Sequence, residues 1–292
     1  MSHRLAPAIV KYRLTVAAKR IAGPAVGVLR RPRVSHGSSV TLFLTNRNNR
    51  YPLELTIRTM LAKTRYEPFK VVVADNSSMD GSREWLESVS VRAPLTILQG
   101  ARPQSEWYDR MFREVGTDYW VALHEDLIFT GSDWLADLIG RMESDPDLQL
   151  LEGEYFPPKR GMAEPVSGEV IDLGESLSTW LFCIRTSLRD RLPGASFAFD
   201  RGPAPPKHQR RQCYDLGGRL LRDMRHVGLK YEWMPRWYRT KWHHVGNLSW
   251  VGDHGAGEHM ELKQYQRRDI RRRVQRLARS PVVKLEATHG DP

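Results

Sequence analysis

Two apolar runs in this sequence end abruptly in acidic residues, and this pattern constrains the fold more than any other feature. One run is VVVADNSSMDGS, at residues 71–82, and the other is WVALHEDLIF, at residues 120–129. Strands that are buried on both faces of a parallel sheet have this hydrophobic character. An open α/β sheet binds its ligands beyond the carboxyl ends of its strands, so we expect the acids of both runs in one crevice.

The acidic residues at these two predicted strand ends are Asp75, Asp80, Glu125 and Asp126. Carboxylates that share a site disfavour one another's ionised form unless a positive charge lies between them. A divalent cation that carries a diphosphate supplies such a charge, because Mg²⁺ in nucleotide sites is held by carboxylates together with phosphate oxygens. The sequence therefore indicates a metal-assisted site for a nucleotide-diphosphate sugar.

Strand-length apolar segments alternate with helical patterns through the first half of the chain. After Pro52, the residues Leu53, Ile57, Met60 and Leu61 fall on one face of a helix. The predicted strands are 40–45, 69–74, 95–98 and 119–123, and the further helices are 81–89, 104–115 and one through Trp134, Leu138 and Met142 with Ser132 as its cap. This alternation predicts an α/β fold with a doubly wound, mostly parallel sheet.

The second half of the chain is less regular. A strand is expected at 179–184, and a helix at 214–227 that ends before Gly228. Two segments rich in Pro and Gly, 156–166 and 194–212, read as long loops, which serve as lids or binding loops or else are disordered. Short ordered segments at 231–235 and 238–244 complete the expected body.

The net charge of +11 is concentrated at the two ends of the chain. Residues 1–36 carry +8 and residues 263–292 carry +6, which leaves −3 for residues 37–262. A nucleic-acid-binding domain would carry its basic surface on the fold itself, so this class is disfavoured. We expect a basic N-terminal segment, a catalytic domain with a nucleotide-sugar half (37–152) and an acceptor half (153–262), and a basic amphipathic C-terminal helix and tail.

The cysteine count and the hydropathy pattern bear on the compartment. Cys183 and Cys213 do not form a metal-binding spacing, and two cysteines suit a reducing environment. No stretch approaches the roughly 18 apolar residues of a transmembrane helix, and Lys11 and Arg13 interrupt any signal-peptide core. Together with the basic tails, this predicts a cytoplasmic protein that binds the inner, anionic face of a membrane.

The order of these motifs resembles that of glycosyltransferase family 2, the inverting enzymes of GT-A fold that use nucleotide-diphosphate sugars. The family pattern opens with a strand that runs into a Thr-Asn-Arg turn, here within LFLTNRNNR, and continues with the DNSSMDGS element. The resemblance extends from about Val40 to Trp250. It implies that nucleotide-sugar contacts come from Thr45, Asn46, Arg47, Asp75, Asn76, Ser77 and Asp80.

The third family motif, D-x-D, is present in a changed form, because HED places His124 first and keeps Asp126 last. The resemblance implies a Mn²⁺ or Mg²⁺ ion held at this motif by Asp126 and His124, with His244 of the HVGNLS segment closing the other side. A histidine ligand favours Mn²⁺. Glu125 either ligates the ion or orients the site. A second departure is Asp109, which stands where the family has an Asn near the donor.

The family also carries an acidic catalytic base at the start of a helix, and CYDLGGRL offers Asp215 in that place. Displacement at an anomeric carbon needs a base for the proton of the acceptor hydroxyl. An ordinary aspartate of a first helical turn is the alternative for Asp215. Asp75 ends a buried strand and needs hydrogen-bond donors, which a base or ribose edge would supply, whereas Asp80 fits an Asx turn equally well.

These inferences predict a metal-dependent inverting glycosyltransferase that acts on a glycan or lipid-linked acceptor in cell-envelope or polysaccharide synthesis. One alternative is a sugar-phosphate nucleotidyltransferase, but the NRNNR loop lacks the glycines expected there. Another is a protein without catalytic activity whose tails bind a polyanion. The acceptor half contains Trp233, Trp237, Trp242 and Trp250, for which both stacking on sugars and core packing remain open.

Overall fold

The computed structural model describes residues 37–89, 95–163, 169–206, 209–235 and 238–244, together with positions 268 and 272. At its centre is a seven-stranded sheet with the order β11-β6-β9-β4-β1-β2-β3. Its strands are β1 (Val40–Asn46), β2 (Phe69–Asp75), β3 (Leu95–Gln99), β4 (Tyr119–His124), β6 (Leu148–Glu152), β9 (Leu181–Arg185) and β11 (Lys230–Trp233). Within the described residues, no helix is long and apolar enough to cross a bilayer.

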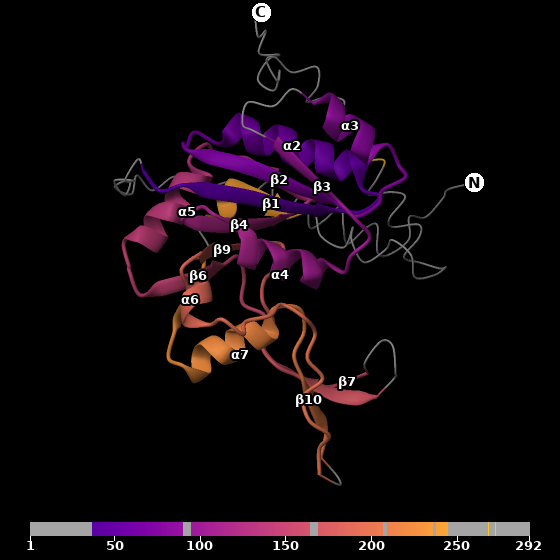
Figure 1. The fold of residues 1–292 in the computed structure, drawn as a ribbon, viewed down its shortest axis with the longest axis vertical. Helices are drawn as coiled ribbons and strands as arrows, with labels where there is room; N and C mark the ends of the chain where they lie inside the picture. The colour runs from indigo at the N-terminus through magenta and orange to yellow at the C-terminus, as the bar shows by residue number, and fades with distance from the viewer. Residues whose placement is uncertain are drawn as a thin grey trace, which may run out of the picture.

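Helices cover both faces of this sheet (Figure 1). Leu42 and Leu44 of β1 pack in one apolar cluster and Phe43 in the other, because neighbouring side chains of a strand point to opposite faces. The first cluster contains residues of α2 (Arg50–Lys63), α3 (Ser82–Ser88) and α5 (Trp134–Glu143). The second contains residues of α4 (Gln104–Glu114), α6 (Leu188–Arg191) and α7 (Gly218–His226). The predicted doubly wound, mostly parallel α/β fold is confirmed.

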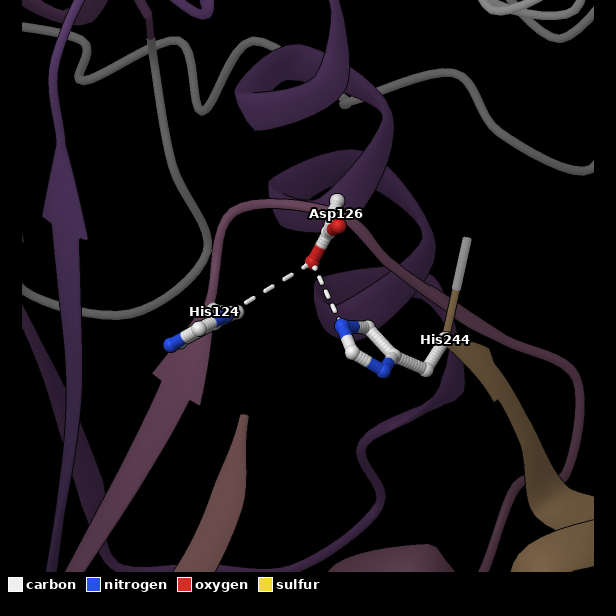
Figure 2. A group of neighbouring side chains, drawn as sticks. All are labelled: His124, Asp126 and His244. Atoms are coloured by element: carbon white, nitrogen blue, oxygen red, sulfur yellow. Dashed lines mark ion pairs between the residues drawn. The ribbon is translucent and has the colours of Figure 1, made fainter. Parts of the chain in front are cut away.

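The strand order reverses between β1 and β4, since the chain proceeds from β1 outward to β2 and β3 and then returns to pair β4 with the other side of β1. Such a reversal is where open α/β sheets bind ligands, beyond the carboxyl ends of the strands. β4 ends there at His124, and the following turn carries Asp126 (Figure 2). The strand after this turn, β5 (Leu127–Phe129), pairs antiparallel with β12 (Trp242–His244), which is distant in sequence.

Several predicted boundaries were wrong in detail. Helix α2 begins at Arg50, so Pro52 lies within its first turn and does not open it. The N-cap of α5 is Asp133 rather than Ser132, and it makes no side-chain capping bond. The helix expected from residue 214 begins at Gly218, although Gly228 follows its end with φ of 69°, as predicted.

The sheet also contains a strand that the sequence reading missed. This strand, β6, is buried at all five positions and therefore shows no alternation of polar and apolar residues. It pairs with β9, which runs antiparallel to both β4 and β6 and thus departs from the parallel pattern.

The two segments expected as long loops contribute to a second, three-stranded sheet. Its order is β10-β8-β7, with β7 at Lys159–Ala163, β8 at Val170–Leu173 and β10 at Arg211–Cys213. Figure 1 shows β7 and β10 extending away from the central sheet as an arm. These strands have three to five residues and few buried side chains, so hydrophobic periodicity could not reveal them.

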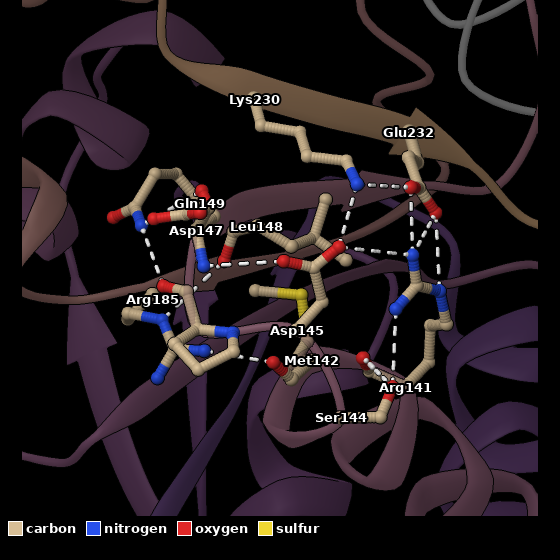
Figure 3. A network of polar contacts seen from close by, with 11 residues as sticks. Arg141, Met142, Ser144, Asp145, Asp147, Leu148, Gln149, Arg185, Lys230 and Glu232 are labelled. Atoms are coloured by element: carbon tan, nitrogen blue, oxygen red, sulfur yellow. Dashed lines mark hydrogen bonds and ion pairs between the residues drawn. The ribbon is translucent and has the colours of Figure 1, made fainter.

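A network of charged side chains fixes the edge strand β11 to the rest of the fold (Figure 3). The Arg141 guanidinium of α5 donates to both oxygens of Glu232, with its Nη2 at 2.6 Å from each. Lys230 Nζ lies 2.5 Å from Asp145 Oδ2 and 3.1 Å from Glu232 Oε1. Arg141 and Glu232 are about one-quarter to one-third exposed, so this pair is shielded from water more than most surface pairs.

We predict that Arg141→Met lowers the free energy of unfolding by about 1–3 kcal/mol, because it removes a bidentate, charge-assisted contact and leaves Glu232 with less compensation. Urea denaturation measures this change. Arg83→Met is the matched control, since Arg83 pairs with Glu87 on an exposed helix face with both side chains about half exposed. Equal losses in the two variants would contradict a specific role for the β11 network.

Candidate active site

The predicted donor motifs meet at the carboxyl ends of β1, β2 and β4. The parallel register places Asn46 beside Asp75 and Thr45 beside His124. Asn46 is buried and Thr45 half-buried. Pairing of the strands therefore brings the first three sequence motifs to one edge of the sheet.

Asp75 is 2% exposed, and each of its oxygens accepts a hydrogen bond from the protein. Asn46 Nδ2 donates to Oδ1 at 2.9 Å, and the Ser78 N–H donates to Oδ2 at 3.1 Å. An ionised carboxylate has about four lone-pair positions, so these two bonds leave Asp75 with capacity for further donors. The local contacts account for its burial without a ligand, which the sequence had not indicated.

The turn that follows Asp75 is held by its own polar side chains. Ser77 adopts the left-handed conformation with φ of 55°, and Asn76 Oδ1 accepts the Arg102 N–H at 2.7 Å. Asp80 accepts the Ser82 N–H at 3.1 Å on one oxygen and the Arg50 N–H at 2.8 Å on the other. Asp80 thus satisfies backbone donors at the starts of α2 and α3, as an Asx-type cap does.

Two further residues expected near the donor, Arg47 and Asp109, have different surroundings. Arg47 is exposed in the turn directly after β1. Asp109, on α4, accepts the Phe197 N–H at 2.7 Å and the Ser196 hydroxyl at 3.0 Å. Its carboxylate therefore fixes the loop before β10 to α4.

Glu125 is turned into the protein and lies outside the group of possible metal ligands. It is 5% exposed, its Oε1 accepts a hydrogen bond from Asn49 Nδ2 at 2.7 Å, and its carbonyl accepts one from the Thr56 hydroxyl at 2.7 Å. Burial and the neighbouring Asp126 raise the pKa of Glu125. These contacts anchor the turn that presents Asp126, so the geometry favours the orienting role for Glu125.

His124, Asp126 and His244 form a compact group at the end of β4 (Figure 2). Asp126 Oδ1 lies 3.2 Å from His244 Nε2 and 4.0 Å from His124 Nδ1. One ligand atom from each residue lies within 4.8 Å of the others. The pairing of β12 with β5 places His244 opposite Leu127, next to Asp126, although the two histidines are far apart in sequence.

The chemistry of this group fits a divalent metal ion. Burial lowers the pKa of His124 to about 4, against the opposite effect of Asp126. His124 is therefore neutral near pH 7, and a neutral imidazole nitrogen is the form that binds metals. Asp126 is 3% exposed, and a carboxylate at such depth requires cationic or hydrogen-bonding partners. Two imidazoles and one carboxylate are a donor set that transition-metal ions accept.

Two further residues orient the histidines, and the sequence pattern identified neither. Gln104 Nε2 lies 3.2 Å from His124 Nε2, so the ring nitrogen that faces away from Asp126 has a polar partner. The Trp180 ring stacks on the His244 ring with a centroid distance of 5.0 Å and an interplanar angle of 14°. Both contacts join residues that are not neighbours in sequence. The sequence predicted only that Gln104 begins a helix, and it gave no signal for either contact.

Asp215 lies in the turn before α7 and is half-buried. Its Oδ1 accepts the N–H of the next residue, Leu216, at 2.8 Å, and its carbonyl accepts the Gly218 N–H at 2.7 Å. The carboxylate is thus near the helix start but not within the helix, in contrast to the expectation. The rest of the HVGNLS segment after His244 lies outside the described residues.

Comparison with known proteins gives a family match over part of the chain. Residues 41–165 match the sequence model of Glycosyl transferase family 2. No curated protein matches the chain.

Several solved structures resemble the fold at low identity. The mannosyltransferase PcManGT from Pyrobaculum calidifontis, in complex with GDP-Man and Mn²⁺, has a TM-score of 0.44 and 16% identity, covering 93% of this chain and 83% of that one. S. aureus TarS 1-349 in complex with UDP-GlcNAc has a TM-score of 0.40 and 18% identity, covering 55% and 48%. The M. tuberculosis glucosyl-3-phosphoglycerate synthase in complex with UDP has a TM-score of 0.41 and 15% identity, covering 72% and 75%.

Proposed function

We propose that this chain, whose residues 41–165 match the sequence model of Glycosyl transferase family 2, transfers a sugar from a nucleotide-diphosphate sugar to an acceptor hydroxyl. The observation that carries the proposal is the His124–Asp126–His244 group at the end of β4. It lies beside the reversal of strand order, where an open α/β sheet binds its ligands. A cation-binding group at this edge suits a substrate with a diphosphate.

The nucleotide is proposed to bind along the ends of β1 and β2. Asp75 keeps acceptor capacity for a base N–H or a ribose hydroxyl, and Asn46 holds it in place. The remaining donor contacts are proposed to come from Thr45, Arg47, Asn76, Ser77 and Asp80. Of these, Asp80 also acts as a structural cap, so its substitution would disturb the loop as well as any ligand.

The divalent ion is proposed to be held by Asp126, His244 and His124, with Mn²⁺ or Mg²⁺ as the candidates. When bound, such an ion acts as a Lewis acid that stabilises the negative charge on the leaving diphosphate. The neutral His124 supplies a lone pair without prior proton loss near pH 7. Trp180 and Gln104 keep the two rings in position.

We predict that Asp126→Ala abolishes binding of Mn²⁺ while the protein remains folded, because the variant loses the carboxylate shared by both histidines. Titration of Mn²⁺ alone, followed by calorimetry or by its electron paramagnetic resonance signal, measures this. Asp147→Ala, at the exposed far end of the fold, is the control that should keep wild-type binding. Unchanged Mn²⁺ affinity in Asp126→Ala would place the ion elsewhere.

For the transfer step we propose a single displacement with inversion, in which Asp215 takes the proton of the acceptor hydroxyl. From the part of the chain that the structure describes, the carboxylate accepts one local N–H, on Oδ1, so its second oxygen is proposed to accept the proton of a hydroxyl. Asp200, the alternative acid in this region, accepts the Gly202 N–H and pairs with Arg222 at 3.0 Å. These contacts hold the pKa of Asp200 below its ordinary range, which makes it the weaker base.

Asp215→Asn is expected to reduce the rate of sugar transfer by about 10²–10⁴-fold, the usual contribution of a general base, while the affinity for the donor changes little. Transfer to a saturating acceptor and donor binding by thermal shift separate the two effects. The matched control is Asp200→Asn, which should keep most of the activity. A near wild-type rate in Asp215→Asn, with loss in Asp200→Asn, would move the base to Asp200.

The acceptor is proposed to be a glycan or lipid-linked molecule of the cell envelope, reached from an anionic membrane surface. The support is the charge of residues 1–36 and 263–292, which lie almost entirely outside the described residues. Each basic residue near an anionic surface contributes about 1 kcal/mol, and the attraction is screened beyond about 8 Å at physiological salt.

We therefore predict that the full chain co-sediments with vesicles containing phosphatidylserine, that added salt releases it, and that a chain of residues 37–262 stays in solution. Neutral phosphatidylcholine vesicles are the control. Equal binding to both kinds of vesicle, or none to either, would contradict the anchoring role of the tails.

A further inference from the structure

Two exposed aromatic side chains lie together at the carboxyl ends of β6 and β11, two strands that the proposed nucleotide site on β1 and β2 does not use. Tyr155, three residues beyond the end of β6, is 44% exposed, and Trp233, the last residue of β11, is 42% exposed. Their ring centroids are 4.7 Å apart, with an interplanar angle of 60°. The Trp242 ring is only 2% exposed and belongs to the core, so Trp242 and Trp233 differ in exposure.

The surroundings hold this pair in place. Tyr231 contacts the Trp233 ring edge-on at 6.1 Å, and its hydroxyl donates to Glu175 at 3.1 Å. On the other side, Phe156, next to Tyr155, forms an antiparallel bridge with Ser176. The charged network of Figure 3 fixes Glu232, the residue before Trp233. Two large apolar rings are therefore presented to solvent on a rigid support.

A buried carboxylate lies behind the pair. Glu152, at the end of β6, is fully buried and accepts the Ser178 N–H at 2.9 Å. Burial raises the pKa of Glu152 to about 8, against the hydrogen bonds of the Ser178 backbone and the Trp233 side chain. The hydrogen bond between the Trp233 side chain and Glu152 thus holds the indole ring against the protein.

A short path of packed residues connects the Tyr155–Trp233 pair to the His124–Asp126–His244 group. β6 and β11 are parallel to each other, and β6 runs in the same direction as β4 because both are antiparallel to β9. Their carboxyl ends consequently share one edge with His124. Gly153 packs so tightly against Trp180 that a Cβ would lie 2.7 Å from the ring, and Trp180 stacks on His244. Two residues of chain, about 7 Å at most, separate Gly153 from Tyr155.

The pair has the chemistry of a sugar-binding surface. A pyranose ring carries C–H groups on one face and hydroxyls around its rim, so it fits an aromatic surface with polar groups beside it. Glu154 and Arg225 supply such polar groups: Glu154 adjoins Tyr155 in the chain, and Arg225 donates to the Tyr231 hydroxyl at 2.5 Å.

We propose that Tyr155 and Trp233 form a platform for a sugar ring of the acceptor, which makes the acceptor of this enzyme a saccharide. The platform rests on the proposed function, since it lies at the edge of the sheet where the donor is proposed to bind. A sugar ring stacked there would direct the growing end of the glycan toward the metal group.

Saturation-transfer NMR with selective irradiation of protein aromatic protons tests this on the full chain. The probes are di- to tetrasaccharides of glucose, mannose, galactose and N-acetylglucosamine. We expect at least one probe to receive saturation on the C–H protons of one ring face, and Trp233→Ala and Tyr155→Ala each to weaken its binding by about three- to tenfold. Trp233→Phe should restore much of the binding, because an aromatic face returns.

Phe199→Ala is the matched control, because Phe199 has a similar exposure of 43% but is remote in sequence from both residues of the platform. Loss in Trp233→Ala and Tyr155→Ala with wild-type binding in Phe199→Ala supports the platform. Equal binding in all variants, or no saccharide binding by the wild type, overturns it. A wild-type thermal shift with nucleotide sugars tests the proposed function separately: a shift without saccharide binding would overturn the platform alone, and no shift would count against the transferase itself.

Discussion

Backbone hydrogen bonds between β1 and its two parallel neighbours are the constraint on which the site depends. They run without interruption from Val40 to the strand ends and place Asn46 beside Asp75 and Thr45 beside His124. A slip of one residue in either register would turn the buried side chains of a strand toward the wrong face. The apolar clusters on both sides of the sheet therefore also specify the position of the polar residues at its edge.

The second constraint is the cost of burying charge at that edge. Asp126 and Glu125 are adjacent and almost fully buried, an arrangement that is unfavourable unless each carboxyl group has its own partners. The fold separates their environments: Asn49 donates to Glu125, whereas the two histidines face Asp126. Sequence neighbours thereby acquire different properties, one anchoring a turn and the other suited to a cation.

The part of the sheet formed by β9, β6 and β11 is built differently from the part formed by β1, β2, β3 and β4. The antiparallel strand β9 lies between β4 and β6 and allows the sheet to continue to β11, whose edge the pairs of Arg141 and Lys230 hold. Because β11 is held at its edge by these ion pairs, the aromatic rings of Tyr155 and Trp233 stay exposed to solvent and do not pack into the core. The short strands of the arm extend the molecule further from the sheet.

The sequence by itself determined the alternation of strands and helices in the first half, the doubly wound sheet and the set of polar residues at its edge. These features follow from local patterns, because apolar runs and helical faces are properties of neighbouring residues. The tertiary structure alone decided the rest. It stacked Trp180 on His244, linked Asp80 to the start of α2 in addition to the expected Asx turn before α3, and added β6 and the arm, whereas the family resemblance had already implied that His244 meets Asp126. These depend on contacts between residues far apart in the chain, whose free energy is realised only when the whole sheet has formed, and no local pattern records them.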